Sequence, residues 1–202
     1  MFSRLAKATR MVTEGIEKYT FGEMARGVQN FFWNEVCDWY VEVTKTRLKD
    51  DAARLQAQRN LIFVLDASMR LMHPLMPFVT EAIWDQMPAS WLDMNEDGVI
   101  ERAEALMVAA WPEPEAFERF IDEEAERSFE LARAVVSDAR STRARYRLSP
   151  KEALPVVVKA ASAEVAEAIE GMADFICGLA NISELSVRAS EGFEKPAAAI
   201  AL

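Results

Sequence analysis

The strongest constraint on the fold is an unbroken amphipathic pattern of nearly thirty residues that begins after Thr20 and runs to about Lys49. Thr20 followed three residues later by Glu23 is a capping box, which predicts that a helix begins at Phe21. Apolar residues recur every three or four positions and form one face: Phe21, Met24, Val28, Phe32, Val36, Trp39 and Val43. The opposite face is polar and comprises Arg26, Asn30, Asn34, Asp38, Glu42 and Lys45. A helix of this kind needs partner helices to cover its apolar face.

Further helical patterns lie on both sides of this one. The same periodicity predicts helices over residues 4–19 and from about 51 to 73, and a shorter helix over 79–87. Long amphipathic helices with short connections favour an antiparallel bundle. The turn-rich segment 88–115 is the expected boundary, so we expect a helical-bundle domain over residues 1–114.

Residues 115–202 form the second expected domain, a long helix followed by a small α/β segment. The helix is expected over 115–146. Runs of β-branched or alternating residues predict strands, and Ser162 is placed to cap a helix. The expected elements are strands at 153–160 and 184–189, helices at 163–172 and 174–179, and a weak strand at 197–202. The predicted fold class is mainly α.

Composition excludes several classes of protein. The chain has 202 residues and a formal net charge of −10, and no apolar run approaches the roughly 20 residues of a membrane span. Its first residues lack the apolar core of a secretory signal, and two cysteines 140 positions apart do not form a disulfide framework. We expect a soluble cytoplasmic protein. A single histidine, no Gly-rich loop and no Cys or His pair at metal spacing predict that no residue of this chain is catalytic.

Two basic clusters are candidates for binding phosphate. The acid excess is concentrated in residues 51–115, with eleven acidic and four basic side chains, so basic surfaces can form elsewhere. The alternative role for both clusters is to complement a helix dipole. Trp33 and Tyr40, on flanking faces of the long helix, are candidates for stacking on bases, against the alternative of core packing. The basic candidates are Lys45, Arg47 and Lys49, and Arg140, Arg143, Arg145 and Arg147.

Residues 93–104 fit the twelve-residue pattern of a calcium loop, D-x-N-x-D-G-x-I-x-x-x-E. The expected ligands would be oxygens of Asp93, Asn95, Asp97, Val99 and Glu104. The alternative is an Asn/Asp/Gly surface turn, favoured by Pro88, which leaves almost no helix before the loop. A calcium-binding helical interaction module is therefore an alternative function.

Four ordered stretches resemble the valyl-tRNA synthetases. Residues 31–45, FFWNEVCDWYVEVTK, are similar to the family's F-x-W-x-x-F-C-D-W-Y-x-E-x-x-K, and Ser3-Arg4-Leu5 is similar to the start of the preceding helix. Residues 73–84, HPLMPFVTEAIW, resemble the H-P-x-M-P-F-x-T-E-x-x-W of class I synthetases for valine, isoleucine and leucine. Residues 105–112, ALMVAAWP, resemble S-I-M-V-A-P-W-P. The C-D-W-Y-x-E core favours the valine family.

The resemblance implies an anticodon-binding bundle whose partner is valine tRNA. It implies a parent enzyme that joins valine to tRNA with ATP and Mg²⁺, while this chain lacks the H-I-G-H and K-M-S-K-S signatures. We therefore expect a non-catalytic, monomeric part without a cofactor of its own, separated from the catalytic, editing and coiled-coil parts. Much base reading is expected upstream of Ser3. His73 is expected to shape a turn and cap carbonyls. A stand-alone paralogue that uses the bundle to bind protein is a further alternative.

Overall fold

The structure is a computed structural model that describes residues 1–87, 103–149 and 151–189. These residues fall into two compact units that divide between Asp122 and Glu123. The expected boundary after residue 114 lies upstream of this division, because Phe117 is fully buried in the core of the first unit. None of the helices in the described ranges combines the length and the hydropathy needed to cross a membrane.

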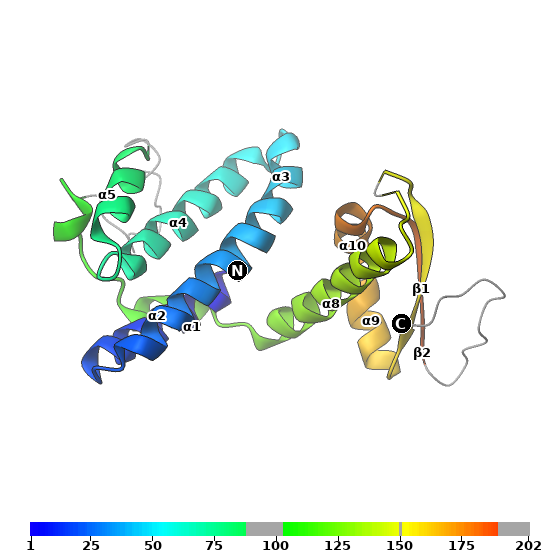
Figure 1. Cartoon of the computed structure of the whole chain (residues 1–202), viewed down its shortest axis with the longest axis horizontal. Coiled ribbons are helices and arrows are strands. Elements are labelled where there is room, and N and C mark those ends of the chain that lie inside the picture. Colours follow the sequence, from blue (N-terminus) through cyan, green and yellow to red (C-terminus); the bar gives the residue numbers. More distant parts are fainter. Residues whose placement is uncertain (88–102, 150, 190–202) are drawn as a thin grey trace. The chain divides into compact units, whose positions relative to one another are not determined.

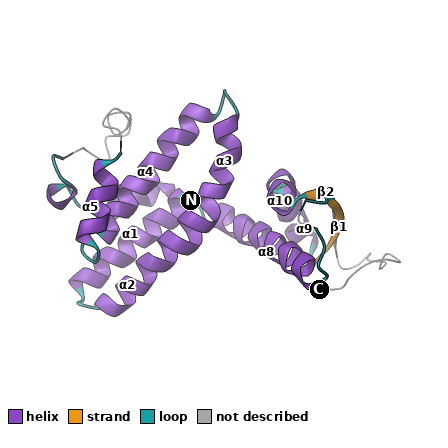
Figure 2. Ribbon diagram, turned by 45° about the horizontal axis from the view of Figure 1, so that its top comes forward, coloured by secondary structure: helices purple, strands orange, loops and turns teal. Residues whose placement is uncertain are grey.

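The first unit is helical (Figures 1 and 2). The long predicted helix is confirmed as three segments that follow one another without a break, α2, η1 and α3, and it lies beside α1 and α4. A short turn joins α1 to α2 at one end of the unit, and another joins α3 to α4 at the other end (Figure 2). The elements are α1 (Phe2–Glu17), α2 (Phe21–Asn30), η1 (Phe31–Tyr40), α3 (Val41–Lys49), α4 (Arg54–Met72), α5 (Pro77–Asp85), η2 (Leu106–Val108), α7 (Pro114–Phe117) and η3 (Glu118–Phe120).

The middle segment of the long helix, η1, is a π-helix and coincides with the FFWNEVCDWY motif. At its end the Val41 N–H donates to the carbonyl of Val36, five residues back. Because a π-turn holds more residues than an α-turn, the buried side departs from the predicted face. Phe31 and Glu35 are buried together with Val36, whereas Phe32 is only half-buried.

The start of the long helix is predicted at the right residue but for the wrong reason. The Thr20 side chain makes no capping hydrogen bond; its carbonyl instead accepts the N–H groups of Glu23 and Met24, each at 3.1 Å. Thr20 has φ −89° and ψ 52°, outside the extended conformation that lets an N-cap side chain reach the first turn. Phe21 was expected on the buried face and is 50% exposed, with its ring against that of Tyr19.

A buried ion pair joins α4 to α5 and to the segment after η2. Arg70 Nε donates to Asp66 Oδ2 at 2.8 Å, and the two side chains are 3% and 0% exposed. Trp84 Nε1 donates to Asp66 Oδ1 at 2.6 Å. Arg70 Nη1 donates to the carbonyl of Ala110 at 2.8 Å. The tryptophan of the T-E-x-x-W motif therefore holds the bundle together.

Other residues of the same motif also have structural contacts. The Thr80 hydroxyl is buried, donates to the Met76 carbonyl at 2.8 Å and lies 2.8 Å from His73 Nδ1. His73 thus lies in the turn as predicted, but its ring bonds the Thr80 hydroxyl and not the carbonyls that we expected. The Glu81 carboxylate accepts the N–H groups of Leu106 (2.7 Å) and Met107 (3.1 Å).

The second unit is the small α/β segment that the sequence predicts. A parallel two-stranded sheet pairs β1 with β2, with Val157 opposite Ser186, and α8 packs on α10 and α9. The Ser162 side chain accepts the N–H of Val165 at 3.3 Å, which confirms its cap. The expected strand at 197–202 lies outside the described residues. The elements are α8 (Glu123–Arg145), β1 (Leu154–Ala160), α9 (Ala163–Glu170), α10 (Ala173–Ala180) and β2 (Ile182–Ala189).

The single helix expected over 115–146 is wrong. It is divided into α7, η3 and α8 by Ile121, whose backbone is extended (φ −70°, ψ 120°). Phe117 is buried in the bundle core, and Phe120 and Ile121 pack against it. The chain must then leave the bundle before it can begin α8, which is why the helical pattern does not continue. The mainly α fold with a small α/β segment is nevertheless confirmed.

Candidate nucleic-acid interface

The end of the first unit where α3 meets α4 carries exposed cations. Lys45, Arg47 and Lys49 lie in the last turns of α3 and all are exposed. Basic side chains near a helix C-terminus interact favourably with its dipole, so their position also has a structural benefit. Lys45 forms an ion pair with Glu42, one turn earlier. The end of α3 therefore presents Arg47 and Lys49 to solvent, beside the exposed carboxylates of Asp50 and Asp51.

The first residue of α4 adds a cation that the sequence analysis did not single out. Arg54 Nη2 lies 2.5 Å from Asp51 Oδ1, and its Nε donates to the Leu48 carbonyl at 3.0 Å. The Asp51 side chain is 91% exposed, so this ion pair is strongly screened by water. The sequence could have indicated Arg54, because the connection between the helix that ends at Lys49 and the next helix is short. A short turn brings the two helix ends together.

The segments that form α5 and η2 are acidic in composition, whereas the α1–α2 turn nearby carries the exposed Lys18. The described residues 71–87 and 103–118 contain six carboxylates and no lysine or arginine. Glu81 is used to hold η2, whereas Asp85 and Glu104 are exposed. An RNA backbone is attracted to cations and repelled by carboxylates, so it is expected to approach this unit at the α3–α4 end.

The two aromatic candidates of the motif have different environments. The Trp33 side chain is 49% exposed on η1, whereas Tyr40 packs against the bundle core. Burial raises the pKa of the Tyr40 phenol. Beside Trp33, Asn34 Nδ2 donates to Asn30 Oδ1 at 2.7 Å, so the predicted polar face is exposed there. Of the pair, Trp33 is the more exposed, and its ring meets that of Phe32 edge-on with the centroids 5.5 Å apart.

In the second unit, two arginines of the other cluster hold backbone segments. Arg143 is 8% exposed and donates to the carbonyls of Ser149 (3.1 Å), Glu152 (2.7 Å) and Asn181 (2.7 Å). Arg140 Nη2 donates to the carbonyl of Leu179 at 2.9 Å.

The other two arginines of this cluster face solvent. Arg145 ends α8 and is exposed. Arg147, also exposed, follows with a left-handed backbone, φ 54°. The structure thus leaves Arg145 and Arg147 accessible to a phosphate, whereas Arg143 has a structural role.

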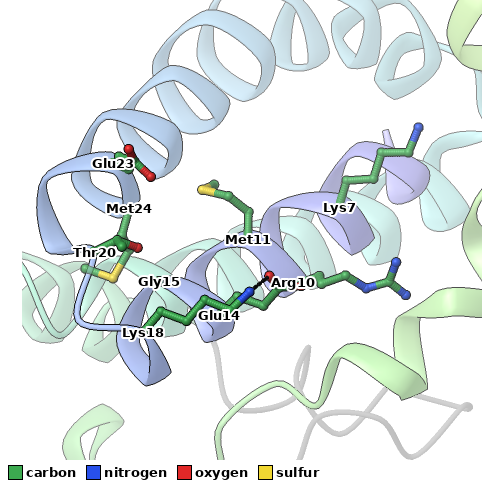
Figure 3. Close-up of a pocket in the computed structure, with 9 residues that line it drawn as sticks. All are labelled: Lys7, Arg10, Met11, Glu14, Gly15, Lys18, Thr20, Glu23 and Met24. Carbon is green, nitrogen blue, oxygen red and sulfur yellow. Dashed lines mark hydrogen bonds and ion pairs between the residues drawn. The ribbon is translucent and has the colours of Figure 1, made fainter.

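An open groove of about 380 Å³ lies between α1 and α2 and is lined by Lys7, Arg10 and Lys18 (Figure 3). Lys18 Nζ lies 2.6 Å from Glu14 Oε2 across its floor, and this ion pair lowers the pKa of Glu14. Arg10 forms an ion pair with Glu118. Because the cations there are matched by carboxylates, the groove does not concentrate positive charge.

The calcium candidates lie largely outside the described residues. Asp93, Asn95, Asp97 and Val99 are not described, and Glu104 is exposed. Within the described ranges no group of three or more His, Cys, Asp or Glu side chains is placed to hold a metal ion. The calcium loop therefore remains a prediction from the sequence.

Comparison with known families gives an independent result. The family described as "Anticodon-binding domain of tRNA ligase" matches residues 1–158, which include the whole first unit and the start of the second. The chain belongs to this family. The exposed cations of the α3–α4 end and Trp33 thus lie on an anticodon-binding domain, and the four stretches quoted above lie within the matched residues.

Similar proteins are valine–tRNA ligases. The chain is 37% identical over 159 residues to that of Fervidobacterium nodosum, which covers 79% of this chain and 17% of the relative. It is 38% identical over 186 residues to that of Thermotoga maritima, and the match covers 92% of this chain and 19% of the relative. It is 33% identical over 189 residues to that of Bacillus licheniformis, and the match covers 93% of this chain and 20% of the relative. The chain thus spans about a fifth of the length of the curated relatives that it matches.

Proposed function

We propose that this chain is the part of a valine–tRNA ligase that binds the anticodon arm of valine tRNA, chiefly through the α3–α4 end of the first unit. The observation that carries the proposal is the family match over residues 1–158, and the exposed cations at the end of α3 and the start of α4 support it. Lys45, Arg47 and Lys49, with Arg54 from the next helix, would contact phosphates and fix the register of the RNA.

Trp33 would contribute stacking on an unpaired base of the anticodon loop, because loop bases are unstacked and can lie on aromatic rings. In the second unit, Arg145 and Arg147 are exposed members of the arginine cluster and would add phosphate contacts; Arg140 is exposed as well but already donates to the Leu179 carbonyl. Arg140 and Arg143 would act indirectly, by holding the segments next to them. None of these residues performs chemistry.

The proposed parent enzyme would attach valine to its tRNA with ATP and Mg²⁺, in a catalytic part that this chain does not include. The similarity to valine–tRNA ligases supports this reaction, and the coverage of about a fifth of each relative supports a role restricted to tRNA binding. We propose a cytoplasmic, monomeric parent. The calcium loop is a separate proposal, tested by whether millimolar Ca²⁺ raises the melting temperature of the wild-type chain and not of the Asp93→Ala variant.

The test is the affinity of this chain for valine tRNA, measured at several salt concentrations for the wild type and a triple variant, Lys45→Gln, Arg47→Gln and Lys49→Gln. The affinity falls as salt rises, and each lost phosphate contact should reduce the magnitude of the negative slope of log K against log salt by about 0.7–0.9. Lys18→Gln, an exposed lysine at the other end of the unit, is the matched control and should leave both affinity and slope unchanged.

A tRNA with an altered anticodon separates base reading from backbone contact. Weaker binding of the altered tRNA means that bases are read within these residues, and Trp33→Ala should then remove part of the difference. Equal binding of both tRNAs means contact with the backbone alone. A triple variant that binds as tightly as the wild type at every salt concentration would refute the proposed interface.

A further inference from the structure

The π-helical segment η1 separates residues that an unbroken α-helix would align. Trp33, Tyr40 and Arg47 follow one another at intervals of about two α-helical turns, so regular α-helical geometry would place all three on one face. In the structure the Trp33 side chain is 49% exposed, whereas Tyr40 packs against the bundle core. The two aromatic residues therefore lie on different sides of the long helix.

The geometry of η1 accounts for this difference. Hydrogen bonds to the third and the fourth residue give helices with about 3.0 and 3.6 residues per turn, so bonds to the fifth give about 4.4, or about 82° per residue. Because η1 includes every step from Trp33 to Tyr40, it leaves Tyr40 about 150° round the axis from Trp33. In an α-helix this angle would be about 20°.

The segment α3 that follows is α-helical and keeps the new phase. Arg47 comes about two α-turns after Tyr40 and lies on its side: burial raises the pKa of the Tyr40 phenol, and the charge of Arg47 acts in the opposite direction. Lys45 and Lys49, by contrast, come round to about 10° and 30° from Trp33. An unbroken α-helix would instead place Arg47 nearest to Trp33, at about 40°.

We define the Trp33 stripe as four exposed residues on the Trp33 side of η1 and α3, namely Trp33, Cys37, Lys45 and Lys49. At about 1.5 Å per residue the stripe is at most about 24 Å long, which matches about seven nucleotides of a stacked strand. Cys37 lies about 30° to one side of Trp33. The carboxylates of Asp38 and Glu42 lie about 50° to the other side, and Glu42 is paired with Lys45.

The chemistry of the Trp33 stripe fits an unpaired nucleic-acid strand. An aromatic ring can stack on a base that is not already stacked within a duplex, and ammonium groups attract phosphates. Because the Asp38 carboxylate repels phosphates, the backbone of a bound strand is expected on the Cys37 side. π-helical segments occur frequently at functional sites, and here the π-turns bring an aromatic ring and two cations into one line.

We propose that η1 sets the phase of the long helix so that one unpaired RNA strand contacts the Trp33 stripe. A base stacks on Trp33, the backbone passes Cys37, and Lys45 and Lys49 bind phosphates. The proposal rests on the proposed function, because it takes the RNA to be the anticodon arm. Of the cations of α3, Arg47 is left to contact phosphates outside this strand.

The test is binding of a single-stranded RNA of about seven nucleotides, with the sequence of the anticodon loop of valine tRNA, to the full chain. Fluorescence anisotropy of the labelled RNA gives the affinity at several salt concentrations. Lys49→Gln and Arg47→Gln are a matched pair, because both residues are exposed near the end of α3 and both changes remove one positive charge.

We expect Lys49→Gln to reduce the magnitude of the negative slope of log K against log salt by about 0.7, the value for single strands. Arg47→Gln should leave the slope and the affinity unchanged. An effect of Arg47→Gln as large as that of Lys49→Gln would overturn the inference, because an unbroken α-helical phase places Arg47 nearer to Trp33. Absence of binding of this RNA would overturn it as well.

Alkylation by iodoacetamide provides a second readout. Bound RNA should slow the reaction of Cys37, and mass spectrometry measures Cys177 of the second unit in the same sample as the control whose rate should not change. Cys37 that reacts equally fast with and without saturating RNA would overturn the inference. If valine tRNA still binds with the salt dependence described above, either failure counts against the Trp33 stripe alone, whereas a chain that does not bind the tRNA refutes the proposed function.

Discussion

Replacing Asp66 by Asn tests whether the buried ion pair holds the bundle. Asparagine keeps the shape of the side chain and an oxygen that can accept from Trp84 Nε1, so packing is preserved. It removes the negative charge opposite Arg70, whose side chain is 3% exposed, and it turns amide hydrogens towards the guanidinium. Removing one partner of a buried ion pair costs about 3–5 kcal/mol, because the other charge remains in a dry environment.

Urea unfolding followed by tryptophan fluorescence measures this loss in the right part of the molecule. All five tryptophans precede residue 112, so the signal comes from the first unit and not from the second. With a urea m-value of about 2 kcal/mol per M, the midpoint should fall by about 2 M. Far-UV circular dichroism at 0 M urea would show that the variant is still folded.

Asp51→Asn is the matched control. Asp51 also faces an arginine in the same helical region of the first unit, but its side chain is 91% exposed. An exposed ion pair contributes about 0–1 kcal/mol, so the midpoint should change little. Equal losses in the two variants, or a loss below about 1 kcal/mol for Asp66→Asn, would refute the argument that burial sets the strength of this ion pair.

Two further predictions concern glycine packing and a thiol. Gly15→Ala should destabilise the first unit by about 1–3 kcal/mol, because the added Cβ would lie 2.8 Å from the Cβ of Met24. Gly178→Ala, where nothing lies within 4 Å of the added Cβ, should stabilise α10 by about 0.5–1 kcal/mol. Urea unfolding followed by circular dichroism measures the change in the free energy of unfolding for each variant. A change of the same sign in the two variants would refute the reasoning. Cys37 is exposed, yet partial desolvation of its thiol, and to a lesser extent the charge of Asp38, raise its pKa. Its alkylation by iodoacetamide should therefore have its pH midpoint above that of an ordinary cysteine, and Asp38→Asn should lower this midpoint; an unchanged midpoint would contradict the effect of the charge.

The elements that depend on neighbouring residues are predictable from the sequence. The apolar spacing after Thr20 predicted the long helix to Lys49, and the β-branched run predicted β1 (Leu154–Ala160). The Ser162 cap was likewise predictable, since its donor lies three residues away. The motif at residues 31–45 also gave the family. These inferences succeed because each depends on side chains that are a few positions apart in the chain.

The tertiary structure sets which of these residues are available for binding. It placed Tyr40 against the core and left Trp33 exposed, and it turned Arg143 onto three backbone carbonyls. It also ended the predicted helix at Ile121, because Phe117 is held in the core of the bundle. Exposure and charge distribution depend on contacts between residues distant in sequence, and periodicity within one segment does not contain that information.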